Sequence, residues 1–257
     1  MRFARALVRP PSASFADGLK RIDQGAPSLA LARIQHRHYC DALVECGLAI
    51  SMLAAEDGLP DATFVEDTAI VHRDSALLTI PGAAQRRDEV SSIGAALSAQ
   101  GLDVEAMSAP GTLDGGDVCE TGPIAFIGLS ERTSADGAQQ LASWFNARGV
   151  EVRIVDIRHM GSILHLKSGL AWLGDGRLLV IDELAPHAAF ADLECVVVPA
   201  QERYAANAVR VNDRVLLASG FPRTEQLLRD LGYRPLLLEM SEFAKMDGGP
   251  SCLSLRY

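Results

Sequence analysis

Short apolar runs alternate with amphipathic stretches along the chain, and this alternation repeats. One clear unit begins with the apolar run at residues 76–80, continues through a helical pattern at 86–100 and Gly101, and ends with a second apolar run at 102–107. Units of this kind, the first and fourth less regular than the others, cover residues 5–53, 76–107, 125–155, 178–199 and 214–239. Short apolar runs bounded by glycine or proline are typical of strands, so each unit predicts a strand-helix-strand module.

The predicted helices are apolar on one side. Val90, Ile93 and Leu97 have the spacing i, i+3 and i+7 in the second unit, and the third unit repeats this spacing. Residues so spaced share one helix face, which must be buried. Because each module also has an exposed strand edge, five modules can close into a ring that leaves no edge unpaired. The pattern predicts an α/β fold with five pseudo-symmetric modules around a central site.

The composition is that of a globular protein with an acidic balance. Of 257 residues, 48% are hydrophobic and 22% are charged, and the formal net charge is −9. We expect a single domain over residues 1–257, because no low-complexity tract divides the chain. The negative charge disfavours nucleic acid and membrane headgroups as partners and weakly favours a cationic small molecule. We find neither a signal-peptide pattern nor an apolar run of about 20 residues, and therefore expect a cytoplasmic protein.

Polar or glycine-rich connectors separate the modules and contain the residues best suited to chemistry. They are PDATFVED (60–67), GTLDGGDV (111–118), SILHLKSG (162–169) and KMDGGPSC (245–252). Loops that converge from different modules are where a functional site is expected. These four connectors are therefore expected to carry most of the catalytic and binding residues.

Cys252 and His165 are the candidates for covalent and acid-base chemistry. The five cysteines are an odd number without a Cys-x-x-Cys pair, which indicates neither a disulfide framework nor a thiolate zinc site. Cys252 follows two glycines and Pro250; such a constrained turn suits a nucleophile, although a buried structural cysteine fits as well. The alternation around His165 predicts a strand with the imidazole opposite Leu164 and Leu166, as an acid-base group in a cleft or as a hydrogen-bonded core residue.

Five acids stand among apolar residues and glycines rather than in a solvated charged segment. They are Asp61, Glu66, Asp67, Asp114 and Asp117. Buried carboxylates need cations, and the Gly-Gly pair between Asp114 and Asp117 allows the backbone to approach a ligand closely. These acids either bind a cationic ligand or cap their own turns.

Arg86 and Arg132 occupy equivalent positions in two modules, after the first apolar run and at the start of the helix. They could clamp a carboxylate together, or each could form an ordinary surface ion pair. With the thiol, the histidine and the acids, they predict a pocket for a zwitterion with an additional cation, such as an amino acid with a guanidinium side chain. Phosphate-loop, serine-hydrolase and zinc-helix motifs do not occur in the sequence.

Six segments resemble the dimethylarginine dimethylaminohydrolases of the guanidine-modifying superfamily. In chain order they are PDATFVED, PGAAQRR, TLDGGD, GLSERTS, LHLKSG and DGGPSC, and the resemblance spans nearly the whole chain. It implies the five-bladed α/β-propeller called the pentein fold, in agreement with the fivefold pattern. It further implies hydrolysis of Nω-methylated arginines, asymmetric dimethylarginine or monomethylarginine, to citrulline plus dimethylamine or methylamine, without a metal or cofactor.

The resemblance also implies roles for individual residues. Cys252 is then the nucleophile, His165 the general acid and base, and Asp114 the residue that orients the guanidinium and the histidine. The implied substrate-binding residues, which hold the guanidinium, the α-amino group and the α-carboxylate or close over the ligand, are Leu19, Asp61, Glu66, Asp67, Arg86, Arg132 and Met246. Pro250 departs from the family pattern of an apolar residue with an N–H, and it makes the turn before Cys252 more rigid.

Two other functions stay open. A deiminase acting on arginine or a related guanidine would use the same catalytic set, although arginine deiminases carry an additional helical domain for which 257 residues leave no room. A non-catalytic binding protein on the same propeller would not need Cys252 and His165 together. The sequence does not decide between mono- and dimethylated substrates, and because relatives are often dimers, a homodimer also stays open.

Overall fold

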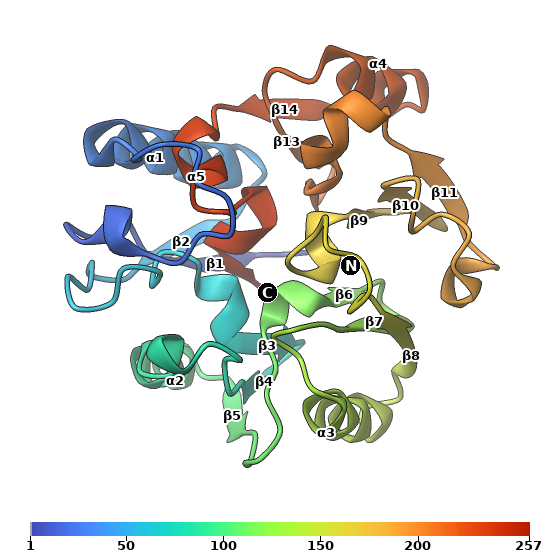
Figure 1. Cartoon of the computed structure of the whole chain (residues 1–257). Helices are drawn as coiled ribbons and strands as arrows, with labels where there is room; N and C mark the ends of the chain where they lie inside the picture. The colour runs from blue at the N-terminus through green and yellow to red at the C-terminus, as the bar shows by residue number, and fades with distance from the viewer. Residues whose placement is uncertain (1) are drawn as a thin grey trace.

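Five three-stranded sheets surround the centre of the molecule in the computed structural model, which describes residues 2–257 (Figure 1). In spatial order they consist of β15 (Leu255–Arg256), β1 (Arg5–Val8) and β2 (Ala49–Met52); β3 (Ala69–His72), β4 (Ser75–Leu78) and β5 (Asp103–Ala106); β6 (Val118–Glu120), β7 (Ile124–Leu129) and β8 (Glu151–Asp156); β9 (Leu170–Gly174), β10 (Arg177–Val180) and β11 (Glu194–Val197); and β12 (Val209–Val211), β13 (Arg214–Ala218) and β14 (Pro235–Leu238). In every sheet the middle strand is antiparallel to the first strand and parallel to the third. The predicted ring of five α/β modules is confirmed.

Helices connect the parallel strands on the outside of the ring (Figure 1). They are α1 (Leu29–Glu45), α2 (Glu89–Ala99), α3 (Ala135–Asn146) and α4 (Pro222–Asp230), and a short α5 (Ser241–Ala244) follows β14. The less regular fourth unit has only the 3-10 turn Ala188–Phe190 in this place, because its connection is short and Pro186 lacks the N–H that a helix interior needs. Among residues 2–257, no helix has the length and apolar character required to cross a membrane.

The apolar helix faces form the core together with the neighbouring sheets. In α2, Ile93 and Leu97 are fully buried, whereas Val90 is only partly buried. Ile93 and Leu97 belong to one hydrophobic cluster with Leu7 of β1 and Leu255 of β15. The helix stripe of one module therefore stabilises the contact with the next module, which explains why the units depend on one another.

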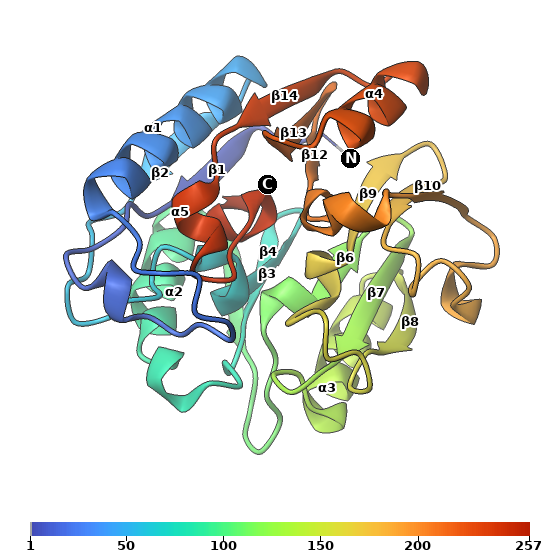
Figure 2. The same cartoon turned by 45° about the horizontal axis from the view of Figure 1, so that its top comes forward.

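The last strand closes the ring. β15 pairs antiparallel with β1, with Leu7 opposite Leu255, so the two ends of the chain meet in one sheet. The C-terminal end of the chain lies near the middle of the molecule in both views (Figures 1 and 2). This closure brings the connector that carries Cys252 to the centre of the ring.

In every sheet, a short 3-10 turn comes just before the strand that the list above names first. These strands are β3, β6, β9, β12 and β15. The turns are Val65–Thr68, Gly115–Asp117, Leu166–Ser168, Ala200–Ala206 and Pro250–Leu253. Neighbouring turns contact one another, so they line the middle of the ring. Four of them belong to the predicted connectors. The fifth, between the fourth and fifth modules, was not recognised in the sequence.

Candidate active site

A small pocket lies among these turns. It encloses about 30 Å³, room for about one water molecule. Eight of the predicted site residues line it: Leu19, Asp61, Asp67, Arg86, Arg132, His165, Met246 and Cys252. The other two, Asp114 and Glu66, are not among its lining residues. The turns therefore bring most of the predicted catalytic and binding residues together from distant parts of the chain.

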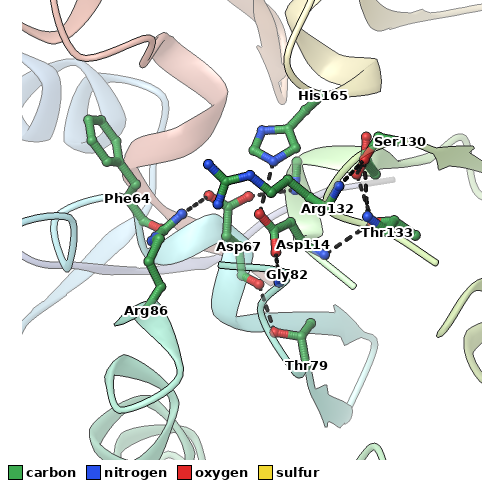
Figure 3. Close-up of polar contacts among 12 residues, drawn as sticks. Phe64, Asp67, Thr79, Gly82, Arg86, Asp114, Ser130, Arg132, Thr133 and His165 are labelled. Carbon is green, nitrogen blue, oxygen red and sulfur yellow. Dashed lines mark hydrogen bonds and ion pairs between the residues drawn. The ribbon is translucent and has the colours of Figure 1, made fainter. Parts of the chain in front are cut away.

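The carboxylate of Asp114 contacts the imidazole of His165. Its Oδ2 lies 3.0 Å from Nε2 of His165, and its Oδ1 accepts the N–H of Gly82 at 2.8 Å (Figure 3). Asp114 is fully buried, so both oxygens are held by protein groups. A carboxylate bonded to one ring nitrogen fixes the orientation of an acid-base histidine. This geometry fits the orienting role predicted for Asp114.

His165 does not lie in a strand, so the prediction from alternation is wrong. The residue immediately precedes the turn Leu166–Ser168, and β9 begins only at Leu170. The N–H of His165 donates to Oγ of Ser168 at 3.3 Å. A serine side chain that bonds nearby backbone competes with strand pairing, and Gly169 continues the turn. Leu166 and His165 are consequently both buried.

The charge around His165 favours its protonated form. Burial alone would lower the pKa of His165, but three nearby carboxylates raise it to about 9. They belong to Asp67, Asp114 and Asp117. The ring packs against Gly116, where a Cβ atom would lie 2.7 Å from Nδ1, so only glycine leaves room for the imidazole. At neutral pH the imidazole of the ligand-free protein can therefore donate a proton.

Asp117 connects two loops and is fully buried. Its Oδ2 accepts hydrogen bonds from Oγ of Ser130 at 2.6 Å and Oγ1 of Thr133 at 2.7 Å. Its Oδ1 accepts the N–H of Leu166 at 2.9 Å, directly after the histidine. These bonds satisfy the carboxylate from within the protein, so for Asp117 the structural alternative applies.

Asp67 and Arg86 form the centre of a buried ion cluster. Nη1 of Arg86 lies 2.5 Å from Oδ2 of Asp67, and Nη2 lies 2.8 Å from Oε2 of Glu89. Nη2 also donates to the carbonyl of Phe64 at 3.1 Å (Figure 3). Burial would raise the pKa of Asp67, but His165 and Arg86 outweigh it and lower the pKa to about 2. Arg86 therefore positions the carboxylate of Asp67, while its predicted part in an α-carboxylate clamp stays a prediction.

Replacing Arg86 by methionine is expected to lower the free energy of unfolding by about 3–5 kcal/mol, because Asp67 and Glu89 would stay buried without their cation. Chemical denaturation measures the change. Arg87→Met is the matched control, since Arg87 is exposed on the adjacent position, and a small effect is expected there. Equal stability of the two variants would show that Arg86 is not needed to neutralise the cluster.

Arg132 contributes a positive charge to the lining of the pocket. Its backbone N–H donates to Oγ of Ser130 at 2.9 Å, while its guanidinium makes no hydrogen bond or salt bridge with any residue in the described range 2–257. Figure 3 shows the side chain extending into the centre of the site. A guanidinium without a protein partner presents its donors to a ligand, and its planar fork suits a carboxylate.

Glu66 is not among the residues that line this pocket, and its predicted role in substrate binding stays a prediction. Its Oε1 lies 2.7 Å from Nζ of Lys167 and 3.2 Å from Nη2 of Arg256. All three side chains line a larger cavity of about 380 Å³. Glu66 and Asp67 are neighbours in one 3-10 turn, and successive residues of such a turn point in different directions. The turn therefore separates the two cavities.

Cys252 lies inside the turn Pro250–Leu253, directly before β15, as predicted. Its N–H donates to the carbonyl of Gly249 at 3.1 Å. Pro250 occupies the first position of the turn, where a missing N–H leaves no hydrogen bond unmade and the fixed φ fits. Burial, followed by the charges of Glu66 and Asp67, raises the pKa of the Cys252 thiol to about 12. In the ligand-free protein this sulfur therefore carries its proton.

Leu19 and Asp61 form the rim of the pocket together with Met246. The N–H of Leu19 donates to both carboxylate oxygens of Asp61 at 3.1 Å. A Cβ atom at Gly18 would lie 2.5 Å from Asp61 Oδ1, so glycine allows this close approach. Burial raises the pKa of Asp61. Leu19, Asp61 and Met246 all line the pocket, which agrees with where their predicted roles require them.

Asp67, Asp114 and His165 also have the spacing of a possible metal site. One ligand atom from each lies within 4.8 Å of the others. Asp67 already pairs with Arg86, and Asp114 with His165. Protein cations therefore balance these carboxylates.

Known proteins are similar to this chain in sequence, two of them over nearly its whole length. A family profile described as arginine deiminase matches residues 56–190. A dimethylarginine dimethylaminohydrolase of Pseudomonas aeruginosa is 38% identical over 99% of this chain and 100% of its own length. That of Streptomyces coelicolor is 36% identical over 98% of this chain and 96% of its own.

Solved structures show the same fold. A cysteine-to-serine mutant of the Pseudomonas aeruginosa enzyme in complex with citrulline superimposes with a TM-score of 0.96, at 37% identity and with 100% of both chains covered. A histidine-to-glycine variant of a dimethylarginine dimethylaminohydrolase, solved as an adduct with S-methyl-L-thiocitrulline, gives a TM-score of 0.95 at 37% identity, covering 99% of this chain and 100% of its own. The fivefold fold, the convergent pocket and the full-length similarity together place this chain in the dimethylarginine dimethylaminohydrolase family.

Proposed function

We propose that this protein hydrolyses Nω-methylated arginines, asymmetric dimethylarginine and monomethylarginine, to citrulline plus dimethylamine or methylamine. The observation that carries the proposal is that the thiol of Cys252, the imidazole of His165 and the carboxylate of Asp67 line one pocket with the unpaired guanidinium of Arg132. Family membership and the citrulline complex of a relative support the same substrate class. The proposal treats residues 1–257 as one catalytic domain, since all five modules contribute to the ring.

The charges of the pocket suit the substrate. Asp67 lines the pocket beside the imidazole and offers its carboxylate to a guanidinium, which needs a fixed partner because its delocalised charge makes its carbon a poor electrophile. Asp114, which is bonded to His165, keeps the imidazole in place. Asp61 lies at the rim, where it can receive the α-amino group. Arg132 provides donors for the α-carboxylate. Each charge of a methylated arginine thus meets a protein group of opposite sign.

The pocket is narrow, at about 30 Å³, so a movable cover would ease the entry of a substrate the size of an amino acid. Leu19 and the segment after it are the covering elements: the N–H of Leu19 bonds to Asp61, and the N–H of Arg21 donates to Oδ2 of Asp247 at 2.5 Å. Both bonds hold a loop to pocket-lining carboxylates, and a loop of this kind is able to act as a lid.

The first half of the reaction forms a covalent adduct. Arrival of the substrate cation offsets the carboxylates that keep Cys252 protonated, so the thiol releases its proton to solvent. The thiolate adds to the guanidinium carbon, and the bond from that carbon to the methylated nitrogen breaks. Protonated His165 gives its proton to this nitrogen, and the amine leaves. The amidino carbon is then bonded to the sulfur of Cys252.

The second half releases the product. Neutral His165 removes a proton from water, and the water oxygen adds to the carbon of the adduct. The bond between carbon and sulfur then breaks and the hydroxyl proton of the adduct passes to solvent, which returns the thiolate and gives the ureido group of citrulline. His165 is again protonated at the end, so one residue serves as acid and then as base.

The substrate class is tested by measuring citrulline released from asymmetric dimethylarginine, monomethylarginine and arginine. The proposal expects turnover of the methylated substrates with release of the corresponding amine. Release of citrulline and ammonia from arginine alone would assign the site to a deiminase instead. Absence of turnover for all three substrates in folded protein would favour a non-catalytic binding function.

Replacing Arg132 by methionine is expected to raise KM for asymmetric dimethylarginine about 30- to 100-fold, because the α-carboxylate loses a bidentate, charge-assisted partner. Steady-state kinetics measure KM, and a simple alkylguanidine without a carboxylate should lose no kcat/KM. Glu131→Gln is the matched control, since Glu131 is the exposed neighbour. An equal loss for substrates with and without the carboxylate would contradict the assignment.

A further inference from the structure

The connector between the fourth and fifth sheets carries a polar residue at the position where the other connectors carry site residues. The turn Ala200–Ala206 is followed by Asn207, and β12 begins at Val209. Asp67, His165 and Cys252 occupy or adjoin the equivalent turns of other modules. Asn207 is 5% exposed. Every module therefore presents a polar or nucleophilic side chain to the middle of the ring.

Asn207 contacts the nucleophile turn with both ends of its amide. Its Oδ1 accepts the N–H of Ser251 at 3.1 Å, and its Nδ2 lies 3.9 Å from Sγ of Cys252. Because the carbonyl end must face the N–H of Ser251, the orientation of the amide is determined by this bond. The amino end of Asn207 therefore faces the sulfur with a donor hydrogen.

Gly249 makes this contact possible. Its backbone is extended, with φ −148, so no unusual backbone conformation requires glycine there. A Cβ atom at this position would, however, lie 2.5 Å from Cγ of Asn207. The same segment is held by Tyr204, whose hydroxyl donates to the carbonyl of Gly248 at 2.7 Å. The connector of the fourth module thus packs directly against the turn that carries Cys252.

We propose that Asn207 is a further catalytic residue, which donates a hydrogen bond from Nδ2 to the Cys252 thiolate while its Oδ1 holds the nucleophile turn. The thiolate forms before attack on the substrate and again when citrulline leaves, so this role rests on the proposed function. A neutral amide donor stabilises the anionic sulfur without adding a fixed positive charge that would repel the substrate cation.

One other side-chain donor lies near the sulfur, since Oγ of Ser251 is 3.8 Å from Sγ of Cys252. The titratable and charged groups around the thiol are Glu66, Asp67, His165 and Tyr204, with Asp61, Asp247, Arg86 and Arg132 across the pocket. Substitution of Asn207 leaves Ser251 and all of these side chains in the protein. A change in the reactivity of the thiol then reports the lost contacts of Asn207.

The test measures the rate of alkylation of Cys252 by iodoacetamide at one fixed pH near neutrality, with the modified peptide quantified by mass spectrometry. Well below the thiol pKa this rate is proportional to the fraction of thiolate. Asn207→Leu removes the donor with little change in size, and we expect alkylation to slow about tenfold and kcat/KM to fall about 10- to 100-fold. Asn207→Asp keeps an acceptor for Ser251 but removes the donor, and its alkylation should be slower still. An unchanged alkylation rate in folded Asn207→Leu would overturn the proposal.

Iodoacetamide reacts without substrate turnover, so the proposal is tested even if the substrate class is wrong. Failure of citrulline release in the wild type would refute the proposed function and leave the alkylation result intact. Circular dichroism and thermal unfolding confirm that each variant is folded.

A double-mutant cycle gives an independent test. Gly249→Ala alone is expected to displace the amide and slow alkylation, whereas in an Asn207→Ala background there is room for the added methyl and the same change should have little effect. The two substitutions should therefore be strongly non-additive. Additive effects would show that Gly249 and Asn207 act separately, against the proposal.

Discussion

Replacing Cys252 by serine is expected to abolish citrulline release, with kcat reduced by a factor on the order of 10⁴ or more. A serine hydroxyl at the same place ionises far less readily than a thiol, and the carboxylates Glu66 and Asp67 further disfavour an anion there. The measurement is a citrulline assay with asymmetric dimethylarginine at saturating concentration. Substrate binding should persist, because the carboxylates and Arg132 that receive the substrate are unchanged.

The control for this variant is Cys195→Ser. Cys195 is a partly buried cysteine of β11 and is absent from the lining of both cavities. We expect nearly wild-type turnover from it. Thermal shift with citrulline distinguishes loss of chemistry from loss of the pocket: a Cys252→Ser protein that still binds citrulline but does not turn over supports the nucleophile. Appreciable turnover by the Cys252→Ser protein would exclude a covalent adduct on Cys252.

Replacing His165 by glutamine is expected to reduce kcat for asymmetric dimethylarginine about 10²- to 10⁴-fold, the range for loss of a general acid and base. The amine then leaves without a proton donor, and water attacks the adduct without a base. Citrulline release and the mass of trapped enzyme adduct are the two measurements. Accumulation of an adduct on Cys252 would show that the second half of the reaction is the slower one in the variant.

The pH dependence supports the same assignment. His165 has a folded-state pKa raised to about 9, so the wild-type rate should fall on the alkaline side as this proton is lost. The stability that protonated His165 contributes is fully present below its unfolded pKa of about 6.5 and is lost as pH rises through about 9. As the pH rises between these two values, the melting temperature of the wild type should therefore fall more than that of His165→Gln.

His38→Gln is the matched control for the pH experiment. His38 is an exposed residue of α1, and its replacement should leave the alkaline fall in rate unchanged. If His165→Gln and wild type showed the same pH dependence of stability, the raised pKa of His165 would be wrong.

Several site residues could be predicted from the sequence because the connectors are local features. Glycine pairs, proline and isolated acids mark where strands end, and the resemblance supplied roles for Cys252, His165 and Asp114. The strand predicted at His165 failed, since the serine and glycine after it form a turn that a two-residue alternation does not reveal. Asn207 was missed because its connector has no glycine pair, and its adjacent charges, Glu202 and Arg203, match no catalytic motif. Its place in the fivefold repeat was the available signal.

The sequence by itself determined the five modules and thus the class of fold, because strand and helix periodicity depends on the backbone and on which faces are apolar. Only the tertiary structure decided which neighbouring side chain faces which cavity. Glu66 meets Arg256, 190 positions away, while Asp67 meets Arg86. A short 3-10 turn gives no long periodic pattern from which such directions could be read, and buried charges select partners that only the closed ring brings near.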